Sequence, residues 1–435
     1  MHSFHYKDGQ LHCENVPLAD LAARHGTPLY VYSQATLAGH FERLDTALAP
    51  VDHMVCYAVK ANSNLGVLKV LADLGAGFDI VSGGELFRVL KAGGRADRCT
   101  FAGVGKTEAE IAYALDQGIY SFNAESEAEL ETFNAIAGAR GVKAPVALRV
   151  NPNVDAKTHK YISTGKSENK FGVDFENVVA AYERAARLPY LHLRGVQMHI
   201  GSQLTSVGPF EEAVRKVAPL AKHLKETHGI EFFSIGGGIG IVYHGSFESG
   251  SADWWQNKEA ADRPLTVDVY AQKLLPELQS LGLKILLEPG RLIVGNAGVL
   301  LTKVLYTKKG AAKTFQIVDA GMGDLIRPAL YQGHHEIVPL KEPSSAQREK
   351  IDVVGPICET GDFFMQDAEL PPLAADDVVA LMSAGAYGFV MASNYNSRPL
   401  PAEILVHGNQ AKVVRKRQSL EDLIQGESTG ESSDR

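Results

Sequence analysis

Cysteine is scarce in this chain of 435 residues, and its spacing excludes two common kinds of site. The four cysteines, Cys13, Cys56, Cys99 and Cys358, stand far apart and form no CxxC pair. Zinc sites and dense disulfide frameworks need closely spaced cysteines, so we expect neither, and no metal site is predicted. Three of the four are interpreted as packing residues. Cys358 differs because it lies in a polar, turn-rich segment, residues 355–362 (GPICETGD).

Long apolar runs and clusters of basic residues are also missing. No segment reaches the roughly 18 uninterrupted apolar residues of a membrane span, and the first residues do not resemble a secretion leader. The 51 acidic and 43 basic residues give a net charge of −8 and are spread along the chain, with no run suited to a phosphate backbone. We therefore predict a cytoplasmic protein that binds neither membranes nor nucleic acid.

The pattern of residues 36–288 is that of a parallel α/β fold, because short apolar runs alternate with amphipathic stretches. Eight such strands with intervening helices predict a (β/α)8 TIM barrel, in which chemistry gathers at the carboxyl ends of the strands. The predicted strands are residues 54–58, 77–81, 100–101, 121–122, 146–150, 195–199, 232–235 and 284–287. Helical patterns cover residues 64–74, 84–92, 107–117, 125–136, 176–187 and 210–228.

A second domain is predicted from residues 1–35 together with residues 289–420. Its alternating pattern and its Pro and Gly turns favour an antiparallel β-domain, either a sandwich or a barrel-like sheet. The residues beyond 425 contain no apolar side chain, so the tail 426–435 is predicted to be disordered. The strands predicted for this domain are residues 4–6, 29–32, 299–306, 314–319, 350–354, 377–382 and 402–406.

Polar residues at the ends of barrel strands are the candidates for chemistry. Lys60 follows an apolar strand in residues 57–62 (YAVKAN), and an amine held in a desolvated pocket can form a Schiff base with an aldehyde cofactor. The backbone amides of residues 235–240 (IGGGIG) could close around a phosphate. Taken singly, each has an ordinary alternative: a lysine after a strand is usually a surface charge, and glycines also serve tight turns.

Three further strand ends carry polar side chains. Asp79 ends the second strand, and residues 196–202 (VQMHIGS) end another with His199, followed by the hydroxyl of Ser202. In residues 287–291 (LEPGR), Glu288 follows an apolar run, so its charge requires a partner. That partner could be the ring nitrogen of a cofactor or simply the neighbouring arginine.

Six ordered motifs resemble the fold-type III, alanine-racemase-like decarboxylases that use pyridoxal 5'-phosphate, over about residues 20–408. The resemblance implies that Lys60 carries this cofactor, that His199 stacks on its ring and that Glu288 faces its pyridine nitrogen. Racemases of this fold place arginine opposite that nitrogen, so Glu288 favours decarboxylation. The resemblance further implies a homodimer in which the second subunit supplies Cys358 as proton donor. The other cofactor-binding residues that it implies are Asp79, Ser202, Gly237, Gly238, Gly290, Arg291 and Tyr387. The motifs are residues 57–62, 199–203 (HIGSQ), 236–240 (GGGIG), 288–291 (EPGR), 355–362 and 385–388 (GAYG).

Residues 317–331 and 394–399 narrow the resemblance to diaminopimelate decarboxylases. It implies that Arg291, Arg327 and Tyr331 bind the carboxylate at the far end of the substrate, that Glu359 binds the far amino group, and that Tyr387 also contacts substrate. Arginine forks suit carboxylates and a carboxylate suits an ammonium. The implied reaction is decarboxylation of meso-2,6-diaminopimelate to L-lysine and CO2, the last step of lysine biosynthesis.

Alternatives to this reading remain open from the sequence. Another basic amino acid, such as ornithine, lysine or carboxynorspermidine, could be the substrate, or the chain could be a catalytically silent regulator that binds pyridoxal phosphate. The alternative for Arg327 is a surface ion pair. Two positions depart from the family pattern: Gly323 replaces a larger polar residue, and residues 332–335 (QGHH) replace the commoner DAYH.

Overall fold

The computed structural model describes residues 2–155, 170–259 and 263–430. These residues divide into two compact units, each with its own core. The first contains residues 34–242 and 251–297, and the second contains residues 2–33, 243–250 and those from 298 onward. Of the tail predicted to be disordered, residues 431–435 lie outside the described part of the chain.

The first unit is a closed barrel of eight parallel strands, and this confirms the predicted fold class. Each strand pairs with the next in order, and β13 pairs with β5 to close the ring. A short extra strand, β10 (Val173–Asp174), pairs in parallel with β9 and is not one of the eight strands of the closed ring. The barrel strands are β5 (His53–Ala58), β6 (Gly77–Ile80), β7 (Cys99–Phe101), β8 (Ser121–Ala124), β9 (Ala144–Asn151), β11 (Leu191–Met198), β12 (Phe232–Ser234) and β13 (Lys284–Leu287).

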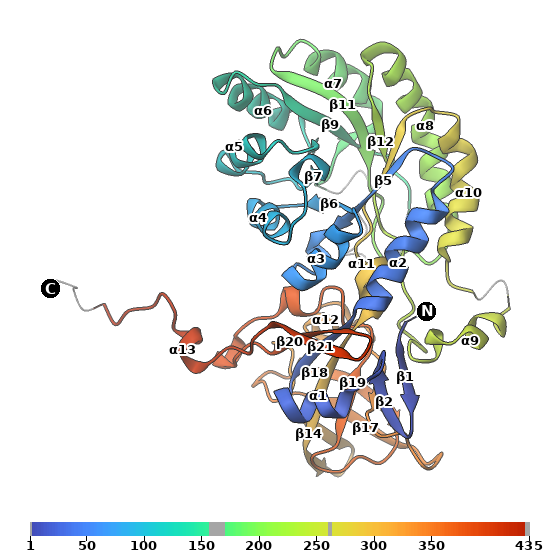
Figure 1. Ribbon diagram of the computed structural model, residues 1–435, viewed down its shortest axis with the longest axis vertical. Coiled ribbons are helices and arrows are strands. Elements are labelled where there is room, and N and C mark those ends of the chain that lie inside the picture. The colour runs from blue at the N-terminus through green and yellow to red at the C-terminus, as the bar shows by residue number, and fades with distance from the viewer. Residues whose placement is uncertain (1, 156–169, 260–262, 431–435) are drawn as a thin grey trace. The chain divides into compact units, whose positions relative to one another are not determined.

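Helices cover the outside of the barrel, and Figure 1 shows α4, α5 and α6 following one another along it. Each of these three helices follows a hydroxyl residue, Ser82, Thr107 or Ser126, whose side chain accepts the backbone N–H three residues later. The helices are α2 (Gln34–Ala47), α3 (Leu65–Asp73), α4 (Gly83–Lys91), α5 (Glu108–Gln117), α6 (Glu127–Ala139), α7 (Val178–Ala185), α8 (Gly208–His228), α9 (Ala252–Gln256), α10 (Val267–Gln279) and α11 (Arg291–Val294). No helix among the described residues is both long enough and apolar enough to cross a bilayer.

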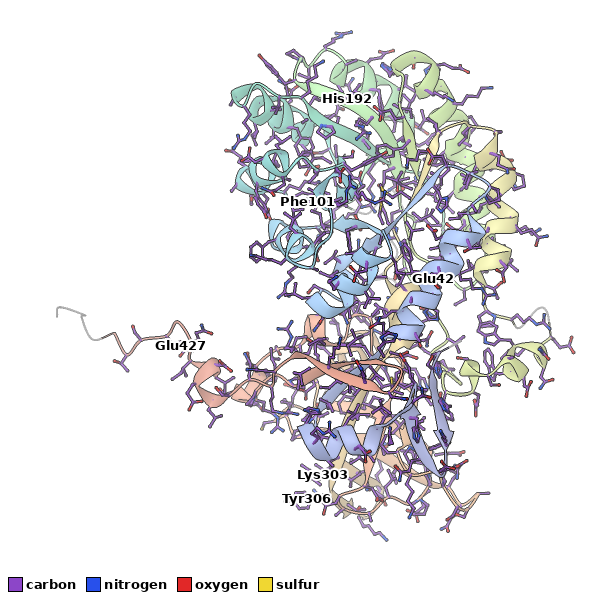
Figure 2. The ribbon with its side chains drawn as sticks, in the orientation of Figure 1. Glu42, Phe101, His192, Lys303, Tyr306 and Glu427 are labelled. Carbon is purple, nitrogen blue, oxygen red and sulfur yellow. The ribbon has the colours of Figure 1, made fainter. Side chains whose placement is uncertain are left out.

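Aromatic side chains fill the layer between the barrel wall and its helices. Phe101 of β7, labelled in Figure 2, stacks on Phe122 of β8 with ring centroids 5.9 Å apart. Phe122 in turn stacks on Phe133 of α6 at 4.7 Å. All three rings are fully buried. Burying side chains of this size stabilises the fold by about 1.5–3 kcal/mol each, so this layer holds the strand ends that carry the polar residues in place.

The second unit is a mostly antiparallel sheet, with strands in the order β18-β17-β15-β14-β4-β20-β21. Two pairs, β15 with β17 and β4 with β20, are parallel. Parallel pairing is possible there because neither pair is joined by a hairpin. Strand β4 comes from the N-terminal segment and pairs with β14. The strands are β4 (Leu29–Ser33), β14 (Gly298–Lys309), β15 (Thr314–Val318), β17 (Glu349–Val354), β18 (Phe363–Leu370), β20 (Ala402–His407) and β21 (Gln410–Arg415).

The remaining elements of the second unit surround this sheet. Strand β19 pairs with both β14 and β16. The first three strands of the chain form a separate antiparallel sheet, which packs its buried face with α1 and β4 in one core. These elements are β1 (Phe4–Lys7), β2 (Gln10–Cys13), β3 (Val16–Pro17), α1 (Leu18–His25), α12 (Arg327–Tyr331), β16 (Ile337–Pro339), β19 (Val378–Leu381) and α13 (Leu420–Leu423).

Candidate active site

The amine of Lys60 forms an ion pair at the carboxyl end of the barrel strands. Lys60 lies in a single 3-10 turn directly after β5, and its Nζ is 2.7 Å from Oδ2 of Asp79 at the end of β6. Asp79 is fully buried, whereas the Lys60 side chain is 38% exposed. Strands β5 and β6 are neighbours in the barrel, so the fold itself brings the two residues together. The amine is thus accessible while a buried carboxylate fixes its position.

Glu288 forms the centre of a polar floor inside the barrel. Its carboxylate is buried and accepts hydrogen bonds from side chains on three different strands. Ser234 Oγ of β12 donates to Oε1 at 2.7 Å, and Gln197 Nε2 of β11 donates to Oε2 at 2.9 Å. Asn123 Nδ2 of β8 donates to Oε1 at 3.3 Å. These three donors are uncharged groups, so they hold the carboxylate of Glu288 in place without neutralising its charge.

The protonation of Glu288 is perturbed by this setting. Burial, and after it the negative charge of Asp79, raises the pKa of Glu288 to about 7. The bonds from Ser234 and Gln197 and the charge of Lys60 act in the opposite direction. A carboxyl group with a pKa near neutrality can share a proton with a basic partner, such as a ring nitrogen.

His199 follows β11 and keeps a neutral ring. Its Nδ1 accepts the backbone N–H of Gly237 at 3.2 Å, so that nitrogen carries no proton. Burial, then the positive charges of Arg149 and Lys60, hold the pKa of His199 well below its usual value. A neutral imidazole of fixed tautomer can lie against an aromatic cofactor without adding charge to the site.

The glycine loop after β12 lies so close to neighbouring backbone that side chains are excluded. A Cβ on Gly237 would lie 2.1 Å from the carbonyl oxygen of Glu288, and a Cβ on Gly238 would lie 2.4 Å from that of Gly201. Gly238 also has φ +110°, a conformation that side chains disfavour. Beside this loop, Arg291 Nη2 donates to Ser202 Oγ at 3.0 Å. Gly290 is equally crowded, with its Cβ position 2.9 Å from the Ala61 methyl.

The barrel residues fit pyridoxal phosphate. The accessible amine of Lys60 suits its aldehyde, the perturbed carboxyl of Glu288 suits its pyridine nitrogen, and the side-chain-free loop with the cationic Arg291 suits its phosphate. Buried oxygen atoms also remain without a hydrogen-bond partner among the described residues, namely Asp79 Oδ1 and Gln197 Oε1. The barrel therefore has a site of the class that binds pyridoxal phosphate.

In the second unit, Arg327 and Tyr331 lie on one short helix, α12, at its first and last positions. Arg327 is 7% exposed, which excludes the alternative of a surface ion pair. Its guanidinium carbon lies 4.4 Å from the ring centroid of Tyr243, and its Nη1 lies 2.7 Å from Nε2 of His335. Tyr331 is partly exposed. The helix therefore presents a fixed cation and a phenol four residues apart.

Cys358 and Glu359 lie on an exposed loop between β17 and β18. Side chains hold this loop through its backbone. The Cys358 N–H donates to Asn396 Oδ1 at 2.8 Å. The Asp362 carboxylate accepts the N–H of Ile357 and that of Met322, both at 2.6 Å. Asp362 thus joins the cysteine loop to the turn that precedes α12, and this brings the two family motifs of the second unit together.

The backbone is constrained at Tyr387 and at the two positions that depart from the family pattern, Gly323 and residues 332–335. Tyr387 has φ +55°, a left-handed conformation that is costly for a tyrosine and typical of functional positions. A Cβ on Gly323 would lie 3.2 Å from the carbonyl oxygen of Ser393, so a larger residue there requires a small shift. Gln332 ends α12 in a left-handed conformation, and His334 stacks on His244 with centroids 3.9 Å apart.

Several residues of the site were not found from the sequence. Asn123, Gln197 and Ser234 hold Glu288, while Asp362 and Asn396 hold the cysteine loop. A signal did exist for Gln197 and Ser234, because each is a polar residue directly after an apolar residue of a predicted strand, and a buried polar group requires a partner.

Comparisons with known proteins agree with this class. Residues 34–295 match the family model described as pyridoxal-dependent decarboxylase, pyridoxal binding domain. A diaminopimelate decarboxylase of Vibrio cholerae is 50% identical over 97% of this chain and 98% of its own, and one of Aquifex aeolicus is 46% identical over 97% and 96%. The crystal structure of diaminopimelate decarboxylase from Helicobacter pylori complexed with L-lysine is 43% identical, with a TM-score of 0.86 over 94% of this chain and 98% of that chain.

The chain therefore belongs to the family of pyridoxal-dependent decarboxylases. Within that family, its full-length relatives place it among the diaminopimelate decarboxylases.

Proposed function

We propose that this protein catalyses the pyridoxal-phosphate-dependent decarboxylation of meso-2,6-diaminopimelate to L-lysine and CO2, the last step of lysine biosynthesis. The observation that carries the proposal is the 50% identity, over almost the entire chain, to a diaminopimelate decarboxylase. The buried carboxyl of Glu288, in the same barrel as the accessible amine of Lys60, supports decarboxylation in particular.

The barrel residues prepare the cofactor for this reaction. Pyridoxal phosphate supplies an electron sink for the pair of electrons released when CO2 leaves. Lys60 binds the cofactor through its amine, and Asp79 holds that amine in place. Glu288 holds a proton at the pyridine nitrogen, because its raised pKa matches the task of sharing one. His199 stacks on the ring, and Arg291, Ser202 and the glycine loop hold the phosphate.

The residues of the second unit recognise the substrate and return a proton. Arg327 and Tyr331, with Arg291, bind the carboxylate at the end of the substrate that does not react. Glu359 binds the amino group at that end, and Tyr387 contacts both cofactor and substrate. The Cys358 thiol returns a proton to the carbon that has lost CO2. Its exposure supports this role, because a proton donor has to be accessible to substrate.

We also propose that the protein is a homodimer in which one subunit supplies Cys358 to the site of the other, and that it works in the cytoplasm. The exposure of Cys358 and Glu359 on a loop supports the shared site, since such side chains can act on a neighbouring subunit. The need for a reduced Cys358 thiol supports the cytoplasm as the location, because cytosolic thiols are kept reduced.

The test is CO2 release by the purified, cofactor-loaded protein from meso-diaminopimelate, lysine and ornithine in parallel, with the amino-acid product identified. We expect release from diaminopimelate alone, with lysine as product. Release only from lysine or ornithine would contradict the proposed substrate, and no release from any of the three would favour a regulator that binds the cofactor without catalysis.

A further inference from the structure

His335 is a buried histidine that contacts Arg327 and has no role in the chemistry proposed above. Its side chain is 0% exposed, in the segment between α12 and β16. The ring touches hydrogen-bonding groups through both of its nitrogen atoms. Nδ1 lies 2.8 Å from the carbonyl oxygen of Met382, just beyond β19, and Nε2 lies 2.7 Å from Nη1 of Arg327.

These two contacts determine the protonation of the ring. A carbonyl oxygen can only accept, so Nδ1 of His335 carries the proton and donates it to Met382. A guanidinium can only donate, so Nε2 carries the lone pair and accepts from Arg327. His335 is therefore a neutral acceptor of fixed tautomer. A second proton on the ring would point at the Arg327 N–H and break this bond.

Arg327 is held on its face as well as on its edge. Tyr243 lies under the guanidinium at 4.4 Å and meets the His335 ring edge-to-face at 5.5 Å. The segment that carries Tyr243 is anchored by Glu336, whose Oε2 accepts the Phe247 N–H at 2.8 Å. The adjacent residues His335 and Glu336 thus both fix the guanidinium, one directly and the other through the tyrosine.

The neutrality of the acceptor decides what Arg327 can bind. An aspartate or glutamate in the same place would orient the guanidinium but would also cancel its charge. An imidazole lone pair orients it without cancelling its charge. We propose that His335 is a positioning residue that makes Arg327 select substrates with a carboxylate at the end that does not react. This inference rests on the proposed function and names the residue behind its substrate preference.

Two substitutions separate this role from a merely structural one. In His335→Gln, the side-chain oxygen can take the place of Nε2 and accept from Arg327, while the bond to Met382 is lost. In His335→Asn, the shorter amide can take the place of Nδ1 and donate to Met382, but it cannot reach Arg327. Steady-state constants for meso-diaminopimelate are measured for both variants, so that KM and kcat are compared separately.

We expect His335→Asn to raise KM for diaminopimelate roughly tenfold or more with a much smaller change in kcat, because a hydrogen bond to a charged group is lost. His335→Gln stays close to the wild type in both constants. In an Arg327→Ala background, His335→Asn has no further effect on KM. His12→Asn, which alters another buried histidine of the same unit, is the matched control and leaves KM unchanged.

The inference is overturned if His335→Asn has a normal KM while His335→Gln has a raised one. It is also overturned if the increases in KM caused by His335→Asn and by Arg327→Ala multiply in the double variant. If neither variant folds, 15N spectra of the wild type decide the matter, since the inference requires a neutral His335 with its proton on Nδ1, and a charged ring contradicts it. A wild type that does not decarboxylate diaminopimelate is a separate result, and it rejects the proposed function.

Discussion

The barrel site and the loop that carries Cys358 in the second unit hold their functional side chains in different ways. In the barrel, Lys60, Asp79 and Glu288 lie at strand ends, and charged or polar side chains from neighbouring strands bind them directly. In the second unit, the backbone N–H of the exposed Cys358 is held by the side chain of Asn396. The barrel thus sets the protonation of its residues by burial, whereas the loop sets the position of a thiol that keeps contact with solvent.

This difference suits the two tasks proposed for these regions, which are to hold the cofactor and to return a proton. An electron sink requires fixed charges in a site shielded from water, where electrostatic effects are strong. A proton donor has to meet its substrate and exchange protons with solvent between turnovers. Changes in the barrel should therefore affect cofactor binding and protonation, whereas changes in the second unit should affect turnover and substrate preference with the cofactor still bound.

The largest effect is expected from Lys60→Ala. The variant should lose the visible absorption of the covalently bound cofactor and all measurable turnover, because no other amine holds that position. Lys69→Ala, which removes an exposed lysine of α3, serves as control and should keep both. Unchanged absorption in Lys60→Ala would show that the cofactor lysine has been assigned wrongly.

Cys358→Ala should lower kcat about a hundredfold or more, as expected for a lost general acid, and should retain the absorption of the bound cofactor. The contrast with Lys60→Ala is the point of the experiment, since only the barrel variant should lose the spectrum. Thr360→Ala, at an exposed position of the same loop, is the control. Full activity of Cys358→Ala would remove the proton-donor role from this loop.

Asp362→Asn tests how the loop is held. The carboxylate accepts two backbone N–H groups, one on each oxygen, and an amide offers only one acceptor. We expect a loss of roughly 1–3 kcal/mol in the free energy of unfolding, measured by denaturant titration, together with a lower kcat. Asp367→Asn, at a half-exposed aspartate, should change neither by much. Equal stability of the two variants would show that Asp362 does not hold the loop.

Glu288 gives the barrel a dependence on pH in the cofactor-free protein. Its pKa of about 7 lies above the ordinary 4.5, so between these values the folded state binds more protons than the unfolded state. Stability therefore falls as pH rises through this window, and Glu288→Gln should remove that loss, on the order of 1–3 kcal/mol. The measurement is the difference in unfolding free energy between variant and wild type at pH 5 and pH 8. A difference that does not change with pH would contradict the account.

The smallest effect is expected at His334 in the second unit. Burial, and then the stacked His244, lowers the pKa of His334 to about 4 from an ordinary 6.5. The unfolded state binds the extra proton in between, so stability should fall slightly as pH drops from 6.5 to 4. NMR titration should give His334 a pKa below 5. An ordinary value for His334 would contradict the observed stacking.

The two units also differ in how far the sequence could predict them. The eight barrel strands were predicted because each is a short apolar run and six of them are followed by an amphipathic stretch. Lys60 and Glu288 were candidates because of their positions at strand ends, and the roles proposed for them came from the resemblance to known decarboxylases. The parallel pairing of β4 with β20 was not predicted, since strand partners distant in sequence leave no local pattern.

Contacts between distant residues account for most of what was missed. Glu288 was predicted to need a partner, but Ser234 and Gln197 could be identified only once the strands were closed into a ring. His335 bonds Met382, which is 47 residues away, so its tautomer could not be inferred from the motif around it. Residue type and spacing predict which chemistry is present, whereas the protonation state depends on the three-dimensional surroundings.

The most direct test of this division of tasks is to mix Lys60→Ala and Cys358→Ala, each inactive alone, and to measure CO2 release from meso-diaminopimelate. If the barrel of one subunit works with the loop of the other, half of the randomly mixed dimers are hybrids with one intact site of two, so activity should recover to about a quarter of the wild type. No recovery, with mixed dimers verified, would show that Lys60 and Cys358 act within a single subunit and would contradict the shared site.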